Sequence, residues 1–382
     1  MLIEKFGVER WMDLYETKCQ FNLAETCVDS LTLEELLDLC GQKNILNDLL
    51  NMRLTYGDIL GSKRLRGAVS KLYQTIETEH VLITHGAIGA NHLVYETLIE
   101  PGDIVVAVHP TYQQHRSIPL CFGAEVRLLN LTSENNFLPD LEELESILTP
   151  GTKLLALNNP NNPAGSLMDR PLLERIVRIA SDCGAYILCD EVYRGLDGAG
   201  DGFTVSVVDL YDKAISTGSM SKVYSLAGLR LGWLASRAPG LIEQVVNHRD
   251  YNTISVGMID DYLAALALES RDKVLARSQA ITRNNRNLLT SWVNNQPLIH
   301  WTPPISGTTA LLKYDLDMPS WDLCVKLVEQ TGVMLCPGSA LGLEGWLRIG
   351  YACEAKVLAK GLALFSDFLA KSASSSSLLT RA

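Results

Sequence analysis

The feature that most restricts the fold of this chain is a regular alternation that begins near residue 80. Short apolar runs (VLITHG, DIVVAVHP, EVRLLNL, KLLALNNP and AYILCDEVY) alternate with longer helical stretches such as AIGANHLVYETLIE and MDRPLLERIVRIASDCG. Strands separated by helices of this length are joined by crossover connections, which produce a mostly parallel sheet. The runs are apolar along almost their whole length, as expected when helices cover both faces of the sheet. The sequence therefore predicts an α/β fold.

The last part of the chain follows a different pattern. KAISTGS and RLGWLAS predict two more strands, residues from about 256 to 297 have helical periodicity, and the remainder mixes strand and helix patterns. We expect a smaller α+β domain there, because its strands are not separated by regular crossovers. The predicted organisation is a large domain (51–285), a small C-terminal domain (286–372), an N-terminal segment that joins the small domain (1–50) and a disordered Ser-rich tail (373–382).

Charge and cysteine content exclude several classes of protein. The 382 residues carry a formal net charge of −11, which argues against a nucleic-acid-binding surface. The first residues, MLIEKFGVERWMDLYETK, contain no apolar core of a secretory signal, and no segment reaches the roughly 18 apolar residues of a membrane span. Nine cysteines without a C-x-x-C pair fit neither a disulfide framework nor a zinc site, and the histidines have no metal-binding spacing. We expect a cytoplasmic protein without a metal.

Polar residues gather where four of the predicted strands end. These clusters are THGAIG (84–89), NNPNNPAG (158–165), DEVY (190–193) and SMSKVYSLAGLR (219–230). Ligands of an open parallel sheet bind at the carboxyl ends of its strands. Each cluster alone also has a structural explanation, because glycine, proline and asparagine favour turns after strands. In the first cluster, the N–H groups of Ala87 and Ile88 would face an anion at a helix start.

Three charged residues in these clusters are unusual for their apolar surroundings. Asp190 ends a buried strand, where a carboxylate is costly unless a cation or donor meets it. Lys222 and Arg230 lie in a stretch that the sequence predicts to be core, although a lone core lysine is most often a structural ion pair. Arg230, with Ser219 and Ser221, suits a phosphate dianion. Lys222 suits a bond to a carbonyl and Asp190 a ring cation, and pyridoxal phosphate meets all these conditions.

The sequence resembles the class I/II aminotransferases, members of the fold-type I group of enzymes that depend on pyridoxal phosphate. The resemblance extends over nearly the whole chain and rests on NNPAG, DEVY, SMSK followed by an arginine eight residues later, and LRIG. The spacings also fit, with 28 residues from Asn162 to Asp190 and 32 from Asp190 to Lys222. The resemblance implies a large domain whose mostly parallel seven-stranded sheet lies between helices, and a smaller α+β domain.

The resemblance assigns the catalytic centre to Lys222, Asp190 and Tyr193. Lys222 matches the lysine that forms the internal aldimine and then moves a proton between the substrate Cα and the cofactor. We expect Arg230 and a dry pocket to lower its pKa. Asp190 matches the aspartate that keeps the pyridine nitrogen protonated, which lets the ring accept electrons. Tyr193 and Asn162 match the pair that binds the phenolic oxygen.

The remaining cofactor contacts also come from the resemblance. Tyr112 matches the aromatic that stacks on one face of the ring, and Val192 would pack against the other face. The phosphate is expected to bind the N–H groups of Ala87 and Ile88, the hydroxyls of Ser219 and Ser221, and the guanidinium of Arg230. Ile88 replaces a hydroxyl residue common at its position, so we expect one phosphate hydrogen bond to be missing.

Two further matches concern the partner subunit and the substrate. Tyr56 matches a tyrosine that reaches the phosphate of the neighbouring subunit, which implies a homodimer with shared active sites. Arg348 matches the arginine that binds the substrate α-carboxylate in a bidentate fork. Asn162 would also contact the substrate, as would Ala24 and Glu25, which replace the usual glycine-containing loop.

The motifs predict the cofactor better than the reaction. We expect an aminotransferase that moves the α-amino group of an amino acid to a 2-oxo acid. The alternative is a lyase or cyclase, because RDYNTISVG (249–257) is similar to a segment of capreomycidine synthase-like enzymes, which cyclise a modified arginine. In that case Glu25 would recognise a cationic side chain. A non-catalytic regulator is disfavoured, because no spare basic segment is present for binding DNA.

Overall fold

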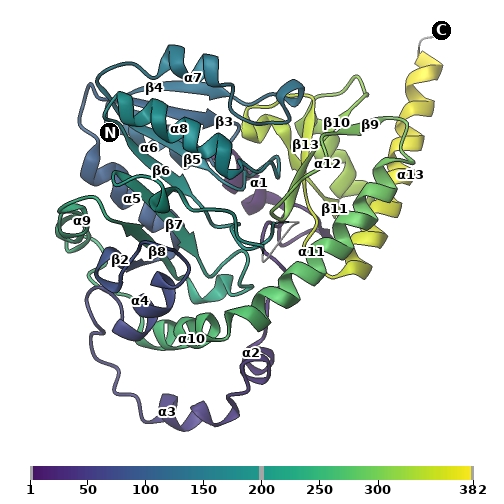
Figure 1. Cartoon of the computed structure of the whole chain (residues 1–382). Coiled ribbons are helices and arrows are strands. Elements are labelled where there is room, and N and C mark those ends of the chain that lie inside the picture. Colours follow the sequence, from purple (N-terminus) through teal and green to yellow (C-terminus); the bar gives the residue numbers. More distant parts are fainter. Residues whose placement is uncertain (1–2, 198–201, 380–382) are drawn as a thin grey trace.

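A seven-stranded sheet forms the centre of the computed structural model, which describes residues 3–197 and 202–379 except for the side chains of residues 43 and 374–379 (Figure 1). In spatial order its strands are β2 (Val81–Thr84), β8 (Gly232–Ser236), β7 (Ala214–Ser219), β6 (Tyr186–Asp190), β5 (Thr152–Asn158), β3 (Ile104–His109) and β4 (Glu125–Asn130). All neighbouring strands from β7 to β4 are parallel, whereas β8 is antiparallel to β7 and β2. The predicted, mostly parallel seven-stranded sheet is confirmed.

Helices cover both faces of this sheet, which explains why its strands are apolar throughout. In β5, Leu154 and Ala156 belong to the apolar core on one face, while Leu155 and Leu157 belong to the core on the other. The first core includes residues of α5 (Gly86–Leu98), α6 (Gln114–Cys121) and α9 (Leu241–Arg249). The second includes residues of α2 (Leu33–Cys40), α3 (Leu46–Leu50), α4 (Lys63–Ser70), α7 (Leu141–Ile147), α8 (Arg170–Asp182), α10 (Met258–Glu269) and α11 (Arg271–Val293).

The smaller domain has its own sheet and core, as predicted. Its four antiparallel strands follow the order β12 (Cys336–Pro337), β13 (Trp346–Gly350), β10 (Thr309–Tyr314) and β9 (Ile299–Trp301). A separate parallel pair joins β1 (Phe21–Asn22) to β11 (Val333–Met334). The core of this domain includes residues of α1 (Gly7–Tyr15), α12 (Ser320–Thr331) and α13 (Ala355–Leu379), and the long helix α11 reaches it from the large domain (Figure 1).

The N-terminal segment divides its side chains between the two cores. Trp11 and Leu23 pack in the core of the small domain, whereas Val28 and Leu36 pack in a core of the large domain. The chain therefore crosses the space between the two domains near residues 24–28. The domain boundaries stay predictions, and α11 extends across the expected boundary at residue 285.

The backbone of α13 continues to Leu379, into the stretch 373–382 for which we expect disorder. Its Ala and Ser residues cost little in a helix that packing stabilises further upstream. Residues 380–382 lie outside the described part of the chain. None of the described helices is both long and apolar enough to cross a membrane.

Candidate active site

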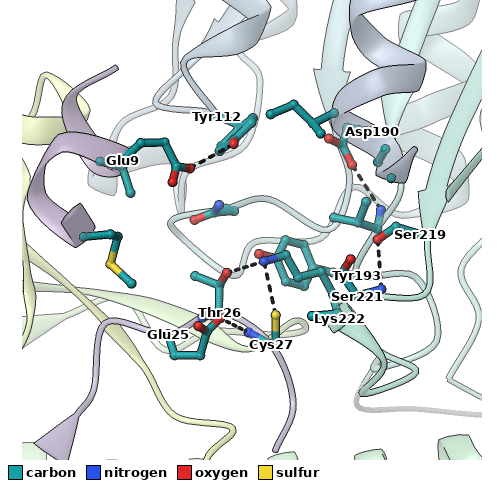
Figure 2. A pocket seen from close by; sticks show the side chains of 18 of the residues that line it. Glu9, Glu25, Thr26, Cys27, Tyr112, Asp190, Tyr193, Ser219, Ser221 and Lys222 are labelled. Atoms are coloured by element: carbon teal, nitrogen blue, oxygen red, sulfur yellow. Dashed lines mark hydrogen bonds between the residues drawn. The ribbon is translucent and has the colours of Figure 1, made fainter. Parts of the chain in front are cut away.

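A cavity of about 370 Å³ lies where β5, β6 and β7 end, beside the first turn of α5. Its walls come from both domains, because Arg348 of β13 also contributes, as do Glu9 and residues 25–27 of the N-terminal segment, which Figure 2 shows. The predicted site residues that line it are Ala24, Glu25, Ala87, Ile88, Tyr112, Asn162, Asp190, Val192, Tyr193, Ser219, Ser221, Lys222, Arg230 and Arg348. Parallel strands bring their carboxyl ends to one edge of a sheet, so residues more than a hundred positions apart meet here.

Asp190 ends β6 and is 5% exposed. Its carboxylate accepts hydrogen bonds from the side-chain amide of Asn91, at 3.1 Å, and from the backbone N–H of Val192, at 3.2 Å. The Nε2 of His115 lies 3.6 Å from the same carboxylate. Asn91 is itself fixed, because its side-chain oxygen accepts the hydroxyl of Thr217 at 2.8 Å. The donors that a buried carboxylate needs are therefore present, and they orient Asp190 within the cavity wall.

Lys222 follows β7 and extends its amine into the cavity (Figure 2). The amine donates hydrogen bonds to the Thr26 hydroxyl at 2.6 Å and to the Cys27 sulfur at 3.5 Å. Burial acts to lower the pKa of Lys222, but Cys27, Tyr193 and Glu25 act to raise it, and the result is a pKa above its usual value. Our expectation that the pKa of Lys222 is lowered was wrong. Its reason was incomplete, because it neglected the acidic groups that surround the amine.

The start of α5 offers unpaired N–H groups to the cavity. In the described part of the chain no side chain caps this helix, and the N–H groups of Ala87 and Ile88 lie in its first turn. Gly86 adopts a φ of 69°, and a Cβ on Gly232 of β8 would collide with the Gly86 and Ala87 backbone. The two glycines thus let the helix start pack directly on the sheet. This arrangement is typical of sites that bind phosphate.

Ser219 and Ser221 extend this anion site from β7. Both residues are buried, and the backbone N–H of Ser221 donates to the Ser219 hydroxyl at 3.3 Å. Arg230 also lines the cavity, but it is exposed and not in the core as we expected. Its backbone is left-handed, with a φ of 54°, and its guanidinium donates to the Ala227 carbonyl at 2.9 Å. Arg230 is exposed because it belongs to a turn at the rim of the cavity.

Arg348 is a buried cation without an acidic partner among the described residues. It is 3% exposed, and its guanidinium donates to the Asn162 side-chain oxygen at 3.3 Å and to the Ala24 carbonyl at 3.0 Å. Both acceptors are neutral, and the buried Nε of Arg348 has no hydrogen-bond partner among the described residues. A buried guanidinium is costly unless a ligand compensates its charge. The geometry therefore suits a carboxylate that enters the cavity.

The chain matches the model of the family "Aminotransferase class I and II" over residues 23–363. It belongs to this family. A PLP-dependent aminotransferase from Streptococcus suis has a solved structure with a TM-score of 0.94 and 41% identity, which covers 97% of this chain and 99% of the other. Capreomycidine synthase from Streptomyces vinaceus is 30% identical over 95% of this chain and 93% of its own length. Aspartate aminotransferase from Thermotoga maritima is 28% identical, over 82% and 83%.

Membership of the class I and II aminotransferases implies pyridoxal phosphate as the cofactor, as predicted. The cavity fits this molecule. The uncapped start of α5 and the two buried serines suit its phosphate, the fixed carboxylate of Asp190 suits its ring nitrogen, and the amine of Lys222 suits its aldehyde. Ala87, Val192 and Tyr193 form a small apolar cluster against which a ring packs well.

Tyr112 joins this aminotransferase site to the N-terminal helix. Its hydroxyl donates to a carboxylate oxygen of Glu9 at 3.0 Å, and its ring lies 4.8 Å from that of Phe6, measured between centroids. Burial, followed by the charge of Glu9, raises the pKa of Tyr112, so the hydroxyl stays protonated and acts as a donor. The N-terminal segment thus holds the aromatic side chain that we expect to stack on the cofactor.

Glu25 lines the cavity and also stabilises its own turn. One carboxylate oxygen accepts the backbone N–H groups of Thr26, at 2.6 Å, and Cys27, at 2.8 Å. Burial acts to raise the pKa of Glu25, but the charge of Lys222 and these hydrogen bonds leave it below the usual value. Glu25 is therefore ionised near neutral pH.

Tyr56 is the predicted site residue that does not line the cavity. Its side chain is 75% exposed, in the loop between α3 and α4. The segment 249–257 also lies apart from the cavity wall, and its buried Arg249 donates to backbone carbonyls of Ile59 and Ile83. The predicted role of Tyr56 at a neighbouring subunit stays a prediction.

Several residues at or behind the cavity wall were not identified from the sequence. They are Val8, Glu9, Met12 and Glu16 from α1 and its end, Thr26 and Cys27 from the loop after β1, and Asn91 and His115 behind Asp190. A weak signal existed in α1, where positions 8, 12 and 16 are four residues apart and share one helical face. No motif marked the others.

Proposed function

We propose that this protein is an aminotransferase that moves the α-amino group of an amino acid to a 2-oxo acid. One observation carries the proposal: the amine of Lys222 and the buried guanidinium of Arg348, whose Nε has no partner among the described residues, line the same cavity. An amino acid whose carboxylate binds Arg348 presents its Cα to the space between them. Membership of the family supports this assignment.

Each residue of the cavity has a separate role in this reaction. When bound, pyridoxal phosphate supplies an aldehyde and a ring that accepts electrons. Arg348 binds the substrate carboxylate and fixes the orientation of the Cα–H bond. Lys222 would take the proton from Cα and deliver it to the former aldehyde carbon of the cofactor, and Asp190 would keep a proton on the ring nitrogen. The side-chain oxygen of Asn162 accepts from Arg348, so its amide nitrogen would serve as a donor to the cofactor oxygen, and Tyr193 would donate to the same atom.

The raised pKa of Lys222 places a condition on this mechanism. A protonated amine neither attacks an aldehyde nor takes a proton from carbon. Thr26 and Cys27 hold the amine by hydrogen bonds, and the pKa of the Cys27 thiol is raised to about 11, mainly by burial. The thiol is therefore neutral at working pH, and Glu25 is the group whose negative charge favours a protonated Lys222 there. We propose that the bound cofactor places the positive charge of its protonated ring nitrogen near the amine and so favours the neutral amine.

The test is a half-reaction with the purified holoenzyme and single amino acids. A transaminase converts the cofactor from its aldehyde to its amine form, which changes the absorbance, and a 2-oxo acid reverses the change. Release of the matching 2-oxo acid is measured by mass spectrometry. If no amino acid converts the cofactor to the amine form, the proposal is wrong.

A lyase or cyclase is the second candidate, because capreomycidine synthase is 30% identical over 95% of the chain. Such an enzyme breaks a bond at Cβ or closes a ring and leaves the cofactor as the aldehyde. The same experiment separates the two candidates. Loss of water or ammonia from the amino acid, with an unchanged aldehyde spectrum, favours the lyase or cyclase.

We also propose a cytoplasmic homodimer. Large apolar side chains are exposed near the loop that carries Tyr56, including Leu50 (82%), Leu54 (73%) and Tyr251 (96%). Apolar groups of this size at the surface favour a protein interface. Light scattering of the purified protein gives its mass in solution. A monomer at micromolar concentration would contradict the dimer.

A further inference from the structure

The cavity contains more acidic side chains than the cofactor and the α-carboxylate of a substrate require. Arg230 suits the phosphate, Arg348 suits the substrate carboxylate, and Asp190 suits the protonated ring nitrogen. Three acidic side chains remain, Glu9, Glu16 and Glu25, and all three line the cavity. None of them forms an ion pair within residues 3–197 and 202–379, apart from the more distant attraction between Glu25 and Lys222.

These acids all come from the N-terminal segment and occupy one side of the cavity. In Figure 2, Glu9 and Glu25 lie across the cavity from Asp190 and Ser219, with Lys222 between the two groups. Glu9 and Glu16 flank Met12 on the face of α1 that lines the cavity. The cavity therefore has an anion-binding side, where the cofactor fits, and an acidic side.

Glu16 is the least compensated of the three. Its carboxylate has no hydrogen-bond partner among the described residues, whereas Glu9 accepts from Tyr112 and Glu25 from two backbone N–H groups. It follows the last turn of α1, which contains no basic residue, and the negative end of the helix dipole adds to its charge. Burial, then the charges of Glu25 and Glu9, raise the pKa of Glu16. The neighbouring acids thus repel one another.

Arg348 gives an independent indication of a ligand. Its guanidinium is buried, lines the same cavity and leaves its Nε without a partner in the described part of the chain. A molecule with a carboxylate near Arg348 and a cation near Glu16 would satisfy both ends. Both residues line the cavity, so a side chain that extends from Cα toward α1 would connect them.

We propose that the substrate is an amino acid with a positively charged side chain, an amine or a guanidinium, which Glu16 binds together with Glu9 and Glu25. This inference rests on the proposed action at Cα. Apolar surface from Val8 and Met12 lines the route and suits the methylene groups of such a side chain. Glu16, Glu9 and Glu25 are specificity residues, since none of them contacts the reacting atoms.

The experiment compares amino acids that differ in charge and little in shape. L-Arginine is paired with L-citrulline, and L-lysine with L-norleucine, in saturation curves with the holoenzyme. The measured quantity is exchange of the Cα proton for deuterium, which occurs in transaminases and in lyases or cyclases alike. We expect kcat/KM for each charged member to exceed that of its neutral partner by tenfold or more, because three carboxylates on one side of the cavity together attract a cation.

Variants assign the preference to named residues. Glu16→Gln should raise KM for the charged substrates about tenfold, leave kcat within about twofold and leave citrulline unchanged. Glu9→Gln and Glu25→Gln should have smaller effects, because each retains an acceptor for its local hydrogen bonds. Asp13→Asn is the matched control, since it removes the same charge from α1 at an exposed position that does not line the cavity, and its charge acts on Glu16 less than those of Glu25 and Glu9. Glu16→Asp should restore part of the preference.

The outcomes separate the two proposals. If citrulline and norleucine exchange as well as arginine and lysine, the inference is wrong although the action at Cα stands. Equal loss in Glu16→Gln and Asp13→Asn would also overturn it, because the effect would then belong to the net charge. If no amino acid exchanges its Cα proton, the proposed function itself fails.

Discussion

The two sides of the cavity differ in how their charged groups are satisfied. The cofactor side, formed by the strand ends and the start of α5, holds Asp190 with a network of donors and presents glycines and serines that fit one rigid group. The acidic side, formed by α1 and residues 24–27, carries Glu16 without a partner among the described residues. A side built for a constant ligand is fully preorganised, whereas a side that selects a substrate keeps its charge uncompensated until the substrate arrives.

The largest expected effect concerns Lys222, which lies between the two sides. Lys222→Ala should lower turnover by about 10⁴-fold or more, because the chain loses both its covalent anchor and its base. Borohydride reduction of the holoenzyme should add the mass of the reduced cofactor to the peptide that contains residue 222. Lys213→Ala, at an exposed lysine, is the control and should keep full activity. An unmodified peptide around residue 222 would contradict the assignment.

Arg348→Lys tests the residue that we expect to bind the substrate carboxylate. The substitution keeps the charge but loses the planar fork, so KM for the amino acid should rise by about 10- to 100-fold. Cofactor affinity, measured by titration of the apoenzyme, should stay within about twofold. Arg175→Lys, at an exposed position of α8, controls for the chemical change. A parallel loss of cofactor binding would mean that Arg348 acts mainly in the fold.

Asn91→Ala tests whether cofactor binding depends on the hydrogen bonds that hold Asp190. The variant removes one donor from Asp190 and leaves the Thr217 hydroxyl unpartnered, so cofactor affinity should fall about tenfold. Thr217→Val removes only the outer hydrogen bond and should cost less. Fluorescence titration with pyridoxal phosphate measures both. Equal affinities for the wild type and both variants would show that Asp190 needs no such support.

The smallest expected effect is a change in the stability of the folded protein when Glu16, on the acidic side, is substituted. The pKa of Glu16 is raised in the folded protein, so the folded state binds this proton more tightly than the unfolded chain. Stability is therefore lost as the pH rises through the pKa of Glu16. Glu16→Gln should unfold about 1 °C above the wild type at neutral pH, a small shift because Glu16 is exposed, and the gap should close in acid. Calorimetry at several pH values measures it.

The same contrast explains what could be predicted from the sequence. Lys222, Asp190 and Asn162 stand in motifs with fixed spacing at strand ends, and the alternation of strands and helices implied that these ends meet. Glu9 lies in a short helix without a motif, and Glu16 follows it. Both are more than 200 residues from Lys222 in the sequence, so nothing in the sequence indicates that they line the same cavity. The direction of the Lys222 pKa shift and the exposure of Arg230 could not be predicted from the sequence either. Both depend on neighbouring residues that lie far away in the chain.

By itself, the sequence determined the α/β class and the mostly parallel sheet, and it indicated the residues that we expect to hold the cofactor, because strand periodicity and ligand chemistry act over short stretches. The tertiary structure alone decided which acids face the substrate. The N-terminal segment crosses between the two cores near residues 24–28, and this path brings α1 over the cavity. Packing of separate cores, which no local pattern encodes, thus places the charges that select the substrate.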